Sequence, residues 1–481
     1  MCRARRKELT VKGTEETERD QPDQAPPSSR DQPVSGDDAE SDAEGARATI
    51  REKSVGFGEA LRFWVKLGFI NFGGPAGQIS IMHRELVEQK RWVSENQFLR
   101  ALNFCMLLPG PEAQQLATYI GWRLHGIRGG LVAGSFFIIP SIFVLLLLSY
   151  LAVAYSDVPA VTGLLYGVGP VVVAVVLEAV LRIGRRTLHH AALVAFAVIS
   201  FVAIYFLSVP FPLVVLGAGL AGFLLHLRYP DVFRVRGHGE ASVESPPEET
   251  ASKGRPSKLR ALKLLGIFLL LWITPVGALW LWQGGEDVLL DQAFFFTGAA
   301  FVTFGGAYSV LSYVADVAVN TYGWLTTEQM VQGLGLAEST PGPLIMVTQY
   351  VGFLGAWNLS GPFEPLLYGT LGAAITTYVT FLPCFFFIFL LAPYIELLAN
   401  NRRIQAALVG VTAAVVGVIA NLAVFFASNV LFPEDFSLGG LDAFALVVAV
   451  ASFVVLQRFK VPIYVMVPVG ALVGMAWTLL A

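Results

Sequence analysis

Pro109-Gly110-Pro111 decides the fold class of this chain, because the motif lies inside a long apolar segment and cannot continue a helix. Each proline removes an N–H donor and clashes with an earlier carbonyl, which costs about 3 kcal/mol in a helix interior. The motif returns 232 positions later as Pro341-Gly342-Pro343. A second motif, Phe72-Gly73-Gly74, returns at the same spacing as Phe304-Gly305-Gly306. These paired helix breakers predict an internal duplication built from broken helices.

The composition is that of a membrane protein. Apolar residues make up 55% of the chain, charged residues only 14%, and the mean hydropathy is +0.61. A soluble protein would carry nearer to about 25% charged residues. Long apolar runs follow one another from about residue 57 onward and do not alternate with polar residues. They predict an all-α polytopic membrane protein and argue against a membrane β-barrel.

Polar stretches divide the chain into five parts. Residues 1–53 are polar and lack the apolar core of a signal peptide, so we expect a disordered cytoplasmic tail. The remaining parts are an N-terminal transporter repeat, a cytoplasmic linker, a connecting transmembrane helix and a C-terminal transporter repeat: 54–228, 229–258, 259–285 and 286–481. Each repeat has six apolar segments, and the connecting helix makes the offset between repeats seven. An odd offset predicts two repeats of inverted topology.

Charge placement favours one topology. Arg182, the linker and Arg402 belong to basic stretches, whereas the loops 283–291, 316–329, 357–365 and 428–440 contain no Lys or Arg. The positive-inside rule therefore places the basic stretches and the N-terminus in the cytoplasm. Full crossings by segments 57–80 and 99–122 would put Arg84 and Lys90 outside. We therefore favour about nine full spans plus four re-entrant hairpins at the motifs, over thirteen full spans.

The breaks are the candidate substrate site. Unpaired backbone groups are tolerated in a bilayer only where they face protein, water or a ligand, and N–H groups at a half-helix N-terminus bind anions. Inverted repeats would bring four breaks together at the midplane. Two alternatives stay open: a simple kink at the proline motifs, and close helix packing at the glycine motifs. The candidate substrate-binding residues are Gly73, Gly74, Gly77, Gln78, His83, Arg84, Pro109, Gly110, Pro111, Gln114, Gly305, Gly306, Ser339, Pro341, Gly342 and Pro343.

Charged side chains near the breaks have two interpretations each. His83 and Arg84 either orient the first hairpin by their charge or attract an anion at the inner mouth. Glu112 and Glu338 are the best intramembrane acids and are candidates for carrying a coupling proton, although Glu338 would equally suit a half-helix N-terminus. The three cysteines show no metal-binding spacing, and the chain has no P-loop. We expect no metal, no cofactor and no use of ATP within this chain.

At these motifs the chain resembles a known family. Residues Leu102–Trp122, Phe69–Arg84 and Gly335–Val347 closely resemble the chromate ion transporter family, in its long-chain, two-domain form. The resemblance covers about residues 57–480. It implies a multi-pass protein of the bacterial inner membrane that exports chromate and confers chromate resistance. The implied partners are chromate, with sulfate as a further candidate substrate, and the lipid bilayer, but no nucleic acid; a homodimer is an open hypothesis.

Other functions remain as alternatives. A carrier of sulfate or another tetrahedral oxyanion belongs to the same class. A membrane-bound chromate reductase or a sensor belongs to different classes. A reductase needs a flavin, a haem or a thiol pair, and the sequence has no fingerprint for any of them. We therefore expect a transporter rather than an enzyme, with uncoupled export, exchange and proton coupling all open.

Overall fold

The computed structural model describes residues 55–229, 258–285, 287–395, 401–433, 437 and 439–480, which belong to one compact unit. These residues form helices and no strand. Seven of the helices are long and apolar enough to cross a membrane. The chain is therefore an all-α polytopic membrane protein, as its sequence predicts. The expected tail, 1–53, lies outside the described residues, as does the expected linker apart from Tyr229 and Lys258.

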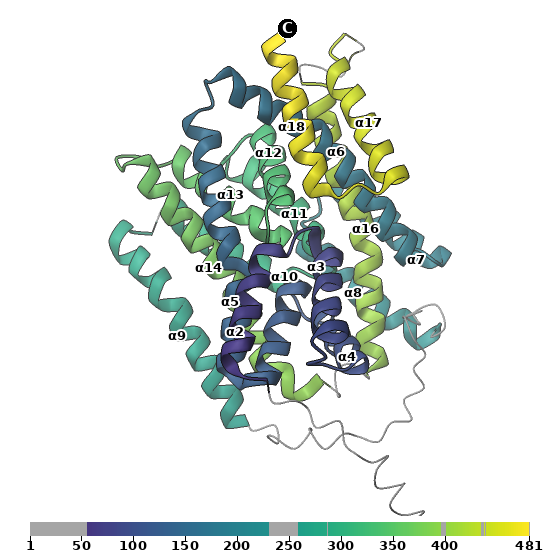
Figure 1. The fold of residues 1–481 in the computed structure, drawn as a ribbon. Coiled ribbons are helices and arrows are strands. Elements are labelled where there is room, and N and C mark those ends of the chain that lie inside the picture. The colour runs from purple at the N-terminus through teal and green to yellow at the C-terminus, as the bar shows by residue number, and fades with distance from the viewer. Residues whose placement is uncertain are drawn as a thin grey trace, which may run out of the picture. The chain divides into compact units, whose positions relative to one another are not determined.

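The first repeat consists of two broken hairpins followed by longer helices. Its elements are α2 (Phe57–Ile70), α3 (Gly74–His83), the π-helix η1 (Arg84–Gln89), α4 (Glu95–Cys105), α5 (Glu112–Ala154), α6 (Pro159–Thr187), α7 (Ala191–Tyr205) and α8 (Phe211–Arg228). The backbone of α5 is non-helical at His125 and Gly126, so α5 is two helices in succession. The connecting helix α9 (Lys258–Gln283) is the least buried of the seven long helices and lies at the outer side of the bundle (Figure 1).

The second repeat has the same order of elements. It comprises α10 (Val288–Val302), α11 (Ala307–Asp316), the π-helix η3 (Val317–Thr321), α12 (Thr327–Ser339), η4 (Leu344–Met346), α13 (Val347–Asn358), α14 (Pro365–Leu391), η5 (Ala392–Tyr394), α16 (Arg402–Leu431), α17 (Ala443–Phe459) and α18 (Ile463–Leu480). The two repeats also share the way in which a matching pair of helices is capped. Ser94 and Gln97 form a capping box at the start of α4, and Thr326 and Gln329 form the same box at α12, again 232 positions later.

The first glycine motif is the turn of a re-entrant hairpin. Lys66 of α2 and Glu85 of η1 form an ion pair of 2.8 Å, so the chain folds back on itself after the break. The open end lies at Val55, whose carbonyl oxygen is 2.8 Å from His125 Nε2 at the kink of α5. The turn reaches only partway along α5, where Asn71 Nδ2 donates to the Phe137 carbonyl at 3.1 Å. The hairpin therefore enters the bundle and leaves on the same side.

The second repeat opens toward the opposite side. The ring of Phe295 in α10 packs against Tyr313 of α11, at a centroid distance of 5.2 Å, so α10 and α11 also fold back on each other. The far end of α5 meets the open end of this repeat, where Tyr150 and Trp357 have ring centroids 6.1 Å apart. The far end of α14 returns to the kink of α5, where a Cβ on Gly130 would lie 2.7 Å from the Phe389 ring. These contacts agree with the predicted inverted repeats and re-entrant hairpins, which stay a prediction.

The two repeats exchange their last helix pairs. Helix α6 packs against α17 and α18, and its counterpart α16 packs against α7 and α8. Glycines allow these close contacts: Gly167 lies against Gly470 and Gly474, and Gly410 lies against Gly222. Small residues at helix contacts let backbones approach in a bilayer, where hydrophobic association between helices is weak. Figure 1 shows α2 and α4 toward one end of the bundle and α12 and α13 toward the other.

Seven of the nine expected full spans are helices long enough to cross a membrane: the second part of α5, and α6, α8, α9, α14, α16 and α18. The other two, α7 and α17, have 15 and 17 residues. A perpendicular span needs about 20 residues, with a range of roughly 17 to 25. Helix α7 is therefore shorter than the expected span at 190–207, whereas α17 has the length of the expected span at 441–457 and lies two residues further along the chain.

Cysteine labelling tests the inverted arrangement. Glu88 lies in η1, between the first two hairpins, and Asn320 lies at the matching position in η3; both residues are exposed. We expect a membrane-impermeant thiol reagent to label Glu88→Cys only from the cytoplasm and Asn320→Cys only from outside. The native Cys105 and Cys384 are buried and should give little background, and the third cysteine is removed by Cys2→Ser in both variants. Labelling of position 88 from outside would contradict the re-entrant topology.

Candidate functional site

The four helix breaks meet in pairs, one from each repeat. The backbone N–H of Gly110 donates to the carbonyl oxygen of Thr303 at 2.8 Å, and the N–H of Gly342 donates to the carbonyl oxygen of Asn71 at 3.3 Å. Asn71 and Thr303 are 232 positions apart, like the two glycines. The two hydrogen bonds are therefore equivalent under the internal symmetry, and each ties a proline motif to the glycine motif of the other repeat.

The proline motifs need glycine at their centre. Gly110 and Gly342 have φ angles of 123° and 118°, which side chains with a Cβ rarely adopt. A Cβ on Gly110 would lie 2.9 Å from Cys384 Sγ, and a Cβ on Gly342 would lie 2.6 Å from Ser141 Cβ. A simple kink would require neither the unusual φ nor the close approach. The motifs are therefore contact points between the repeats.

The glycine motifs each expose the start of a half-helix. Gly73 and Gly74 precede α3 with φ angles of 90° and 65°, and Gly305 and Gly306 precede α11 with φ angles of 78° and 96°. Neither helix has a side-chain cap, so backbone N–H groups of the first turn are available at both N-termini. The helix dipole adds a partial positive charge there. Both ends are therefore suited to a negative group.

The two half-helix ends have different surroundings. A Cβ on Gly74 would meet no atom within 4 Å, so the start of α3 faces open space. A Cβ on Gly306 would lie 3.7 and 4.0 Å from the carboxylate oxygens of Glu112, so the start of α11 faces an acid. Only the α3 end is thus left open for a dissolved anion.

Gln78 links the first glycine motif to the second proline motif. Its Nε2 donates to the Gly342 carbonyl at 2.6 Å and to the Asn71 carbonyl at 3.0 Å, and the side chain is fully buried. The matching position in the second repeat is Val310, so this contact has no counterpart. Near the other proline motif, Gln115 Nε2 donates to the Pro109 carbonyl at 2.6 Å. The polar side chains of the site are asymmetric although the backbone is nearly symmetric.

The remaining candidates beside the breaks have structural contacts. Gln114 is buried, and its Nε2 donates to Thr118 Oγ1 at 3.2 Å, while its Oε1 has no partner. Ser339 Oγ donates to the Leu336 carbonyl at 2.9 Å. A Cβ on Gly77 would lie 2.9 Å from the Phe72 carbonyl oxygen, so glycine is needed to close the first turn. The candidates Pro109, Pro111, Pro341 and Pro343 all lie at the breaks.

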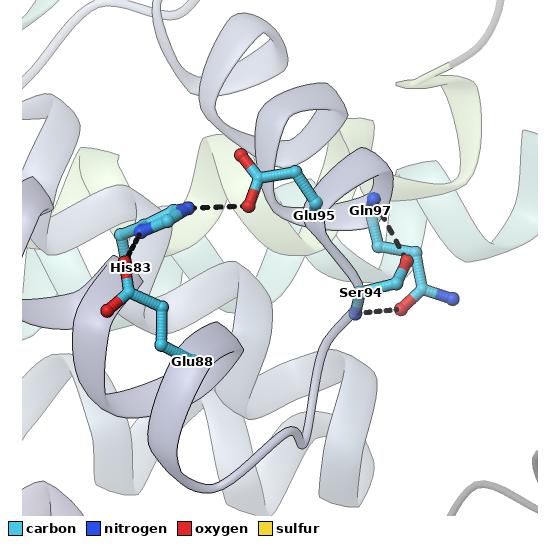
Figure 2. Close-up of polar contacts among 5 residues, drawn as sticks. All are labelled: His83, Glu88, Ser94, Glu95 and Gln97. Atoms are coloured by element: carbon cyan, nitrogen blue, oxygen red, sulfur yellow. Dashed lines mark hydrogen bonds and ion pairs between the residues drawn. The ribbon is translucent and has the colours of Figure 1, made fainter.

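His83 and Arg84 lie apart from the breaks, where α3 passes into η1. Figure 2 shows the His83 ring between two carboxylates: Nε2 is 2.6 Å from Glu95 and Nδ1 is 3.2 Å from Glu88. Two acids beside one imidazole make this place unfavourable for an anion, which favours the orienting role for His83. The Arg84 side chain is exposed. Of the two basic residues, Arg84 is the better candidate for attracting an anion.

Glu112 and Glu338 occupy different kinds of site. Glu112 begins α5 and faces the N-terminus of α11, with Arg186 within electrostatic reach. Glu338 lies in the last turn of α12, is 4% exposed, and accepts a hydrogen bond from the hydroxyl of Tyr308. Glu338 therefore does not cap a half-helix, and Glu112 is the acid beside one.

Several residues at the site were missed by the sequence analysis. The acceptors Asn71 and Thr303 were detectable in principle, because the spacing of 232 pairs them. Ser141 and Cys384 were likewise detectable, since they follow Pro140 and Pro383 in matching runs 243 positions apart. Tyr308 carried no such signal, because Ala76 stands at the matching position of the first repeat.

Comparisons with known proteins agree on one family. A family model described as "Chromate transporter" matches residues 58–223 and 290–475. A chromate transport protein of Pseudomonas aeruginosa is 32% identical over 364 residues, covering 74% of this chain and 77% of that protein. A probable chromate transport protein of Synechococcus elongatus is 26% identical over 76% of this chain and 83% of that protein. A chromate transport protein of Cupriavidus metallidurans is 27% identical over 77% of this chain and 82% of that protein. No solved structure matches.

Substitution of a proline-motif glycine tests the contact between repeats. We expect Gly342→Ala to destabilise the protein by about 1–3 kcal/mol, because a side chain at this φ is strained and meets Ser141. Thermal unfolding in detergent, followed by tryptophan fluorescence, measures the change. Gly298→Ala in α10 is the matched control, because its Cβ meets nothing within 4 Å. Equal thermal unfolding midpoints for the two variants would show that the contact between the repeats at Gly342 tolerates a side chain.

Gln78→Leu tests the asymmetric side-chain bridge. The substitution removes the buried donor to the Gly342 carbonyl, and an unsatisfied buried acceptor costs about 1–3 kcal/mol. We expect a lower thermal midpoint than for the wild type. The control is Gln89→Leu, which changes an exposed glutamine at the end of η1. If Gln78→Leu keeps the thermal midpoint of the wild type, water takes the place of the Gln78 amide as the donor to the Gly342 carbonyl.

Proposed function

Since the chain belongs to the chromate transporter family, we propose that it carries chromate out of the cytoplasm across the bacterial inner membrane and so confers chromate resistance. The observation that supports an anion as substrate is the start of α3, where backbone N–H groups face open space. Such a half-helix end in the bilayer interior is a site for an anionic group. The Gly342 and Gln78 contacts hold the surrounding breaks in place.

Backbone donors suit the substrate class. Chromate is a tetrahedral dianion with four equivalent oxygens, so it requires several donors and no particular base or acid. The candidate binding groups are the first-turn N–H groups of α3, after Gly73 and Gly74, with the proline-motif breaks beside them. Arg84, Arg182 and Arg186 lie toward the proposed cytoplasmic end and would concentrate anions at the inner mouth.

The membrane potential supplies enough energy for export. A charge crossing 100 mV gains about 2.3 kcal/mol, so a dianion leaving an inside-negative cell gains about 4.6 kcal/mol. This supports a concentration gradient of about three decades, because about 1.36 kcal/mol corresponds to a factor of ten. Export of chromate therefore needs neither ATP nor a coupled ion on energetic grounds.

Sulfate is the second candidate substrate. It is also a tetrahedral dianion of similar size, and a site of backbone N–H groups discriminates poorly between two such ions. The chemistry of a reductase has less support, because Cys105 and Cys384 are buried and the chain's relatives are transporters. The chain is thus best described as a non-enzymatic transporter. We place its N-terminus in the cytoplasm, with the basic ends of α6 and α8.

Flux into liposomes tests the proposed function. We expect purified full-length protein to move labelled chromate faster as the potential is made more negative on the side holding chromate. Sulfate added on that side should slow the flux by competition. Measuring the oxidation state of chromium in the same samples separates transport from reduction. Rates that ignore the potential would contradict electrogenic export, and an absence of flux would contradict transport itself.

A further inference from the structure

A buried polar cluster in the second repeat is not needed for binding an anion at α3. Glu338 of α12 and Tyr308 of α11 are 4% and 6% exposed, and the Tyr308 hydroxyl donates to the Glu338 carboxylate. Two further groups, Glu178 and Arg182 of α6, lie within electrostatic reach of both. Arg182 Nη2 is 3.5 Å from Glu178 Oε2. The cluster joins three helices beside the helix breaks.

The charges in this cluster do not balance. The guanidinium of Arg182 pairs with Glu178, so the buried carboxylate of Glu338 has the Tyr308 hydroxyl as its contact and one negative charge is uncompensated when both acids are ionised. An unpaired charge is costly inside the apolar layer of a membrane protein. One proton on a carboxylate removes the excess charge. Glu338 is the better acceptor of that proton, because it is more buried than Glu178, whose side chain is 17% exposed.

Other titratable groups on the neighbouring elements do not face Glu338. Helix α12 packs against α5, α6, α13, α16, α18 and η4. On these elements, Glu112 faces Gly306, Tyr350 packs against Gly333, and Tyr464 packs against Phe72. Arg402 and Arg403 are exposed at the start of α16. The electrostatic neighbours of Glu338 are thus Tyr308, Arg182 and Glu178.

We propose that Glu338, buried and held by Tyr308, is a proton-binding site whose protonation accompanies the binding of the oxyanion. This inference rests on the proposed function and adds a second ligand to it. The step is a reversible protonation of the carboxylate, with no change in the bonds of the oxyanion. Removal of the uncompensated negative charge favours a dianion nearby, and by linkage the dianion favours the proton equally.

The proton site belongs to one repeat only. Ala76 and Met106 stand at the positions matching Tyr308 and Glu338, so the first repeat has no equivalent pair. The nearest exposed part of the cluster is on α6, where the Arg182 side chain is 45% exposed and precedes the basic end at Arg185 and Arg186. One proton therefore binds per protein chain, from the side on which α6 ends.

Oxyanion binding at several pH values tests the proposal. The protein is the full chain in lipid nanodiscs, and the probes are chromate and, separately, sulfate, measured by calorimetry. We expect the wild-type affinity to rise by up to about tenfold for each pH unit of acidification over the range in which Glu338 titrates, as one linked proton requires. Glu338→Gln should bind oxyanion with the site permanently neutral and lose this slope. Because chromate itself takes up a proton, the slope left in Glu338→Gln gives the baseline.

Two further variants keep the test specific. Glu112→Gln is the matched control, since it removes the other intramembrane acid, and it should keep the wild-type slope. Tyr308→Phe should also keep the slope but move its midpoint to higher pH, because the hydroxyl stabilises the ionised carboxylate by donating to it. An effect of Tyr308 on packing alone would lower stability without moving the midpoint.

A second measurement separates failure of this proposal from failure of the proposed function. Infrared difference spectra of the protein without oxyanion should show the C=O band of a protonated carboxylic acid that titrates in the wild type and is missing in Glu338→Gln. If this band is present and no oxyanion binds at any pH, the proposed function is wrong. If oxyanion binds and Glu338→Gln keeps the wild-type pH slope, or Glu112→Gln loses it, the proton site is wrong.

Discussion

Backbone hydrogen bonding in lipid is the constraint on which this fold depends. Four helices break within the apolar layer, and each break leaves N–H and C=O groups that lipid cannot satisfy. The chain meets this need across the repeats, with Gly110 donating to Thr303 and Gly342 donating to Asn71. Each repeat thus supplies a hydrogen-bond acceptor for a helix break of the other repeat. The exchange of helix pairs, α6 with α17 and α18 and α16 with α7 and α8, joins the repeats a second time.

The side chains do not follow the symmetry of the backbone. Gln78, Glu338 and Tyr308 have Val310, Met106 and Ala76 at their matching positions. The accessibility differs as well: Ala76 and Ser80 on α3 are exposed, whereas the matching Tyr308 and Ser312 on α11 are buried. Two similar half-helices therefore lie in different environments, one open and one covered. Inverted-repeat transporters need such a difference, because exchanging the two environments moves access from one side of the membrane to the other.

The sequence predicted the features that depend on local chemistry and on spacing. Prolines and glycines marked the four breaks, the odd number of segments predicted inversion, and basic residues marked one side. What the sequence did not predict depends on which elements meet. The partners of Gly110 and Gly342, the exchange of helix pairs and the short α7 became visible only in the three-dimensional packing. Tyr308 was missed for a different reason. The first repeat has no tyrosine at the matching position, so comparing the two repeats did not identify it.

If the proton proposed on Glu338 crosses the membrane with the oxyanion, the energetics of export change. A dianion that leaves alone carries two charges, but a dianion that leaves with one proton carries a single net charge. The gain falls from about 4.6 to about 2.3 kcal/mol per 100 mV. That smaller gain supports a gradient of a little under two decades, because a factor of ten needs about 1.36 kcal/mol. Coupling to the proton thus costs part of the driving force. In return, the neutral form of the Glu338 cluster lets the apolar interior accept a doubly charged substrate without an uncompensated carboxylate beside it.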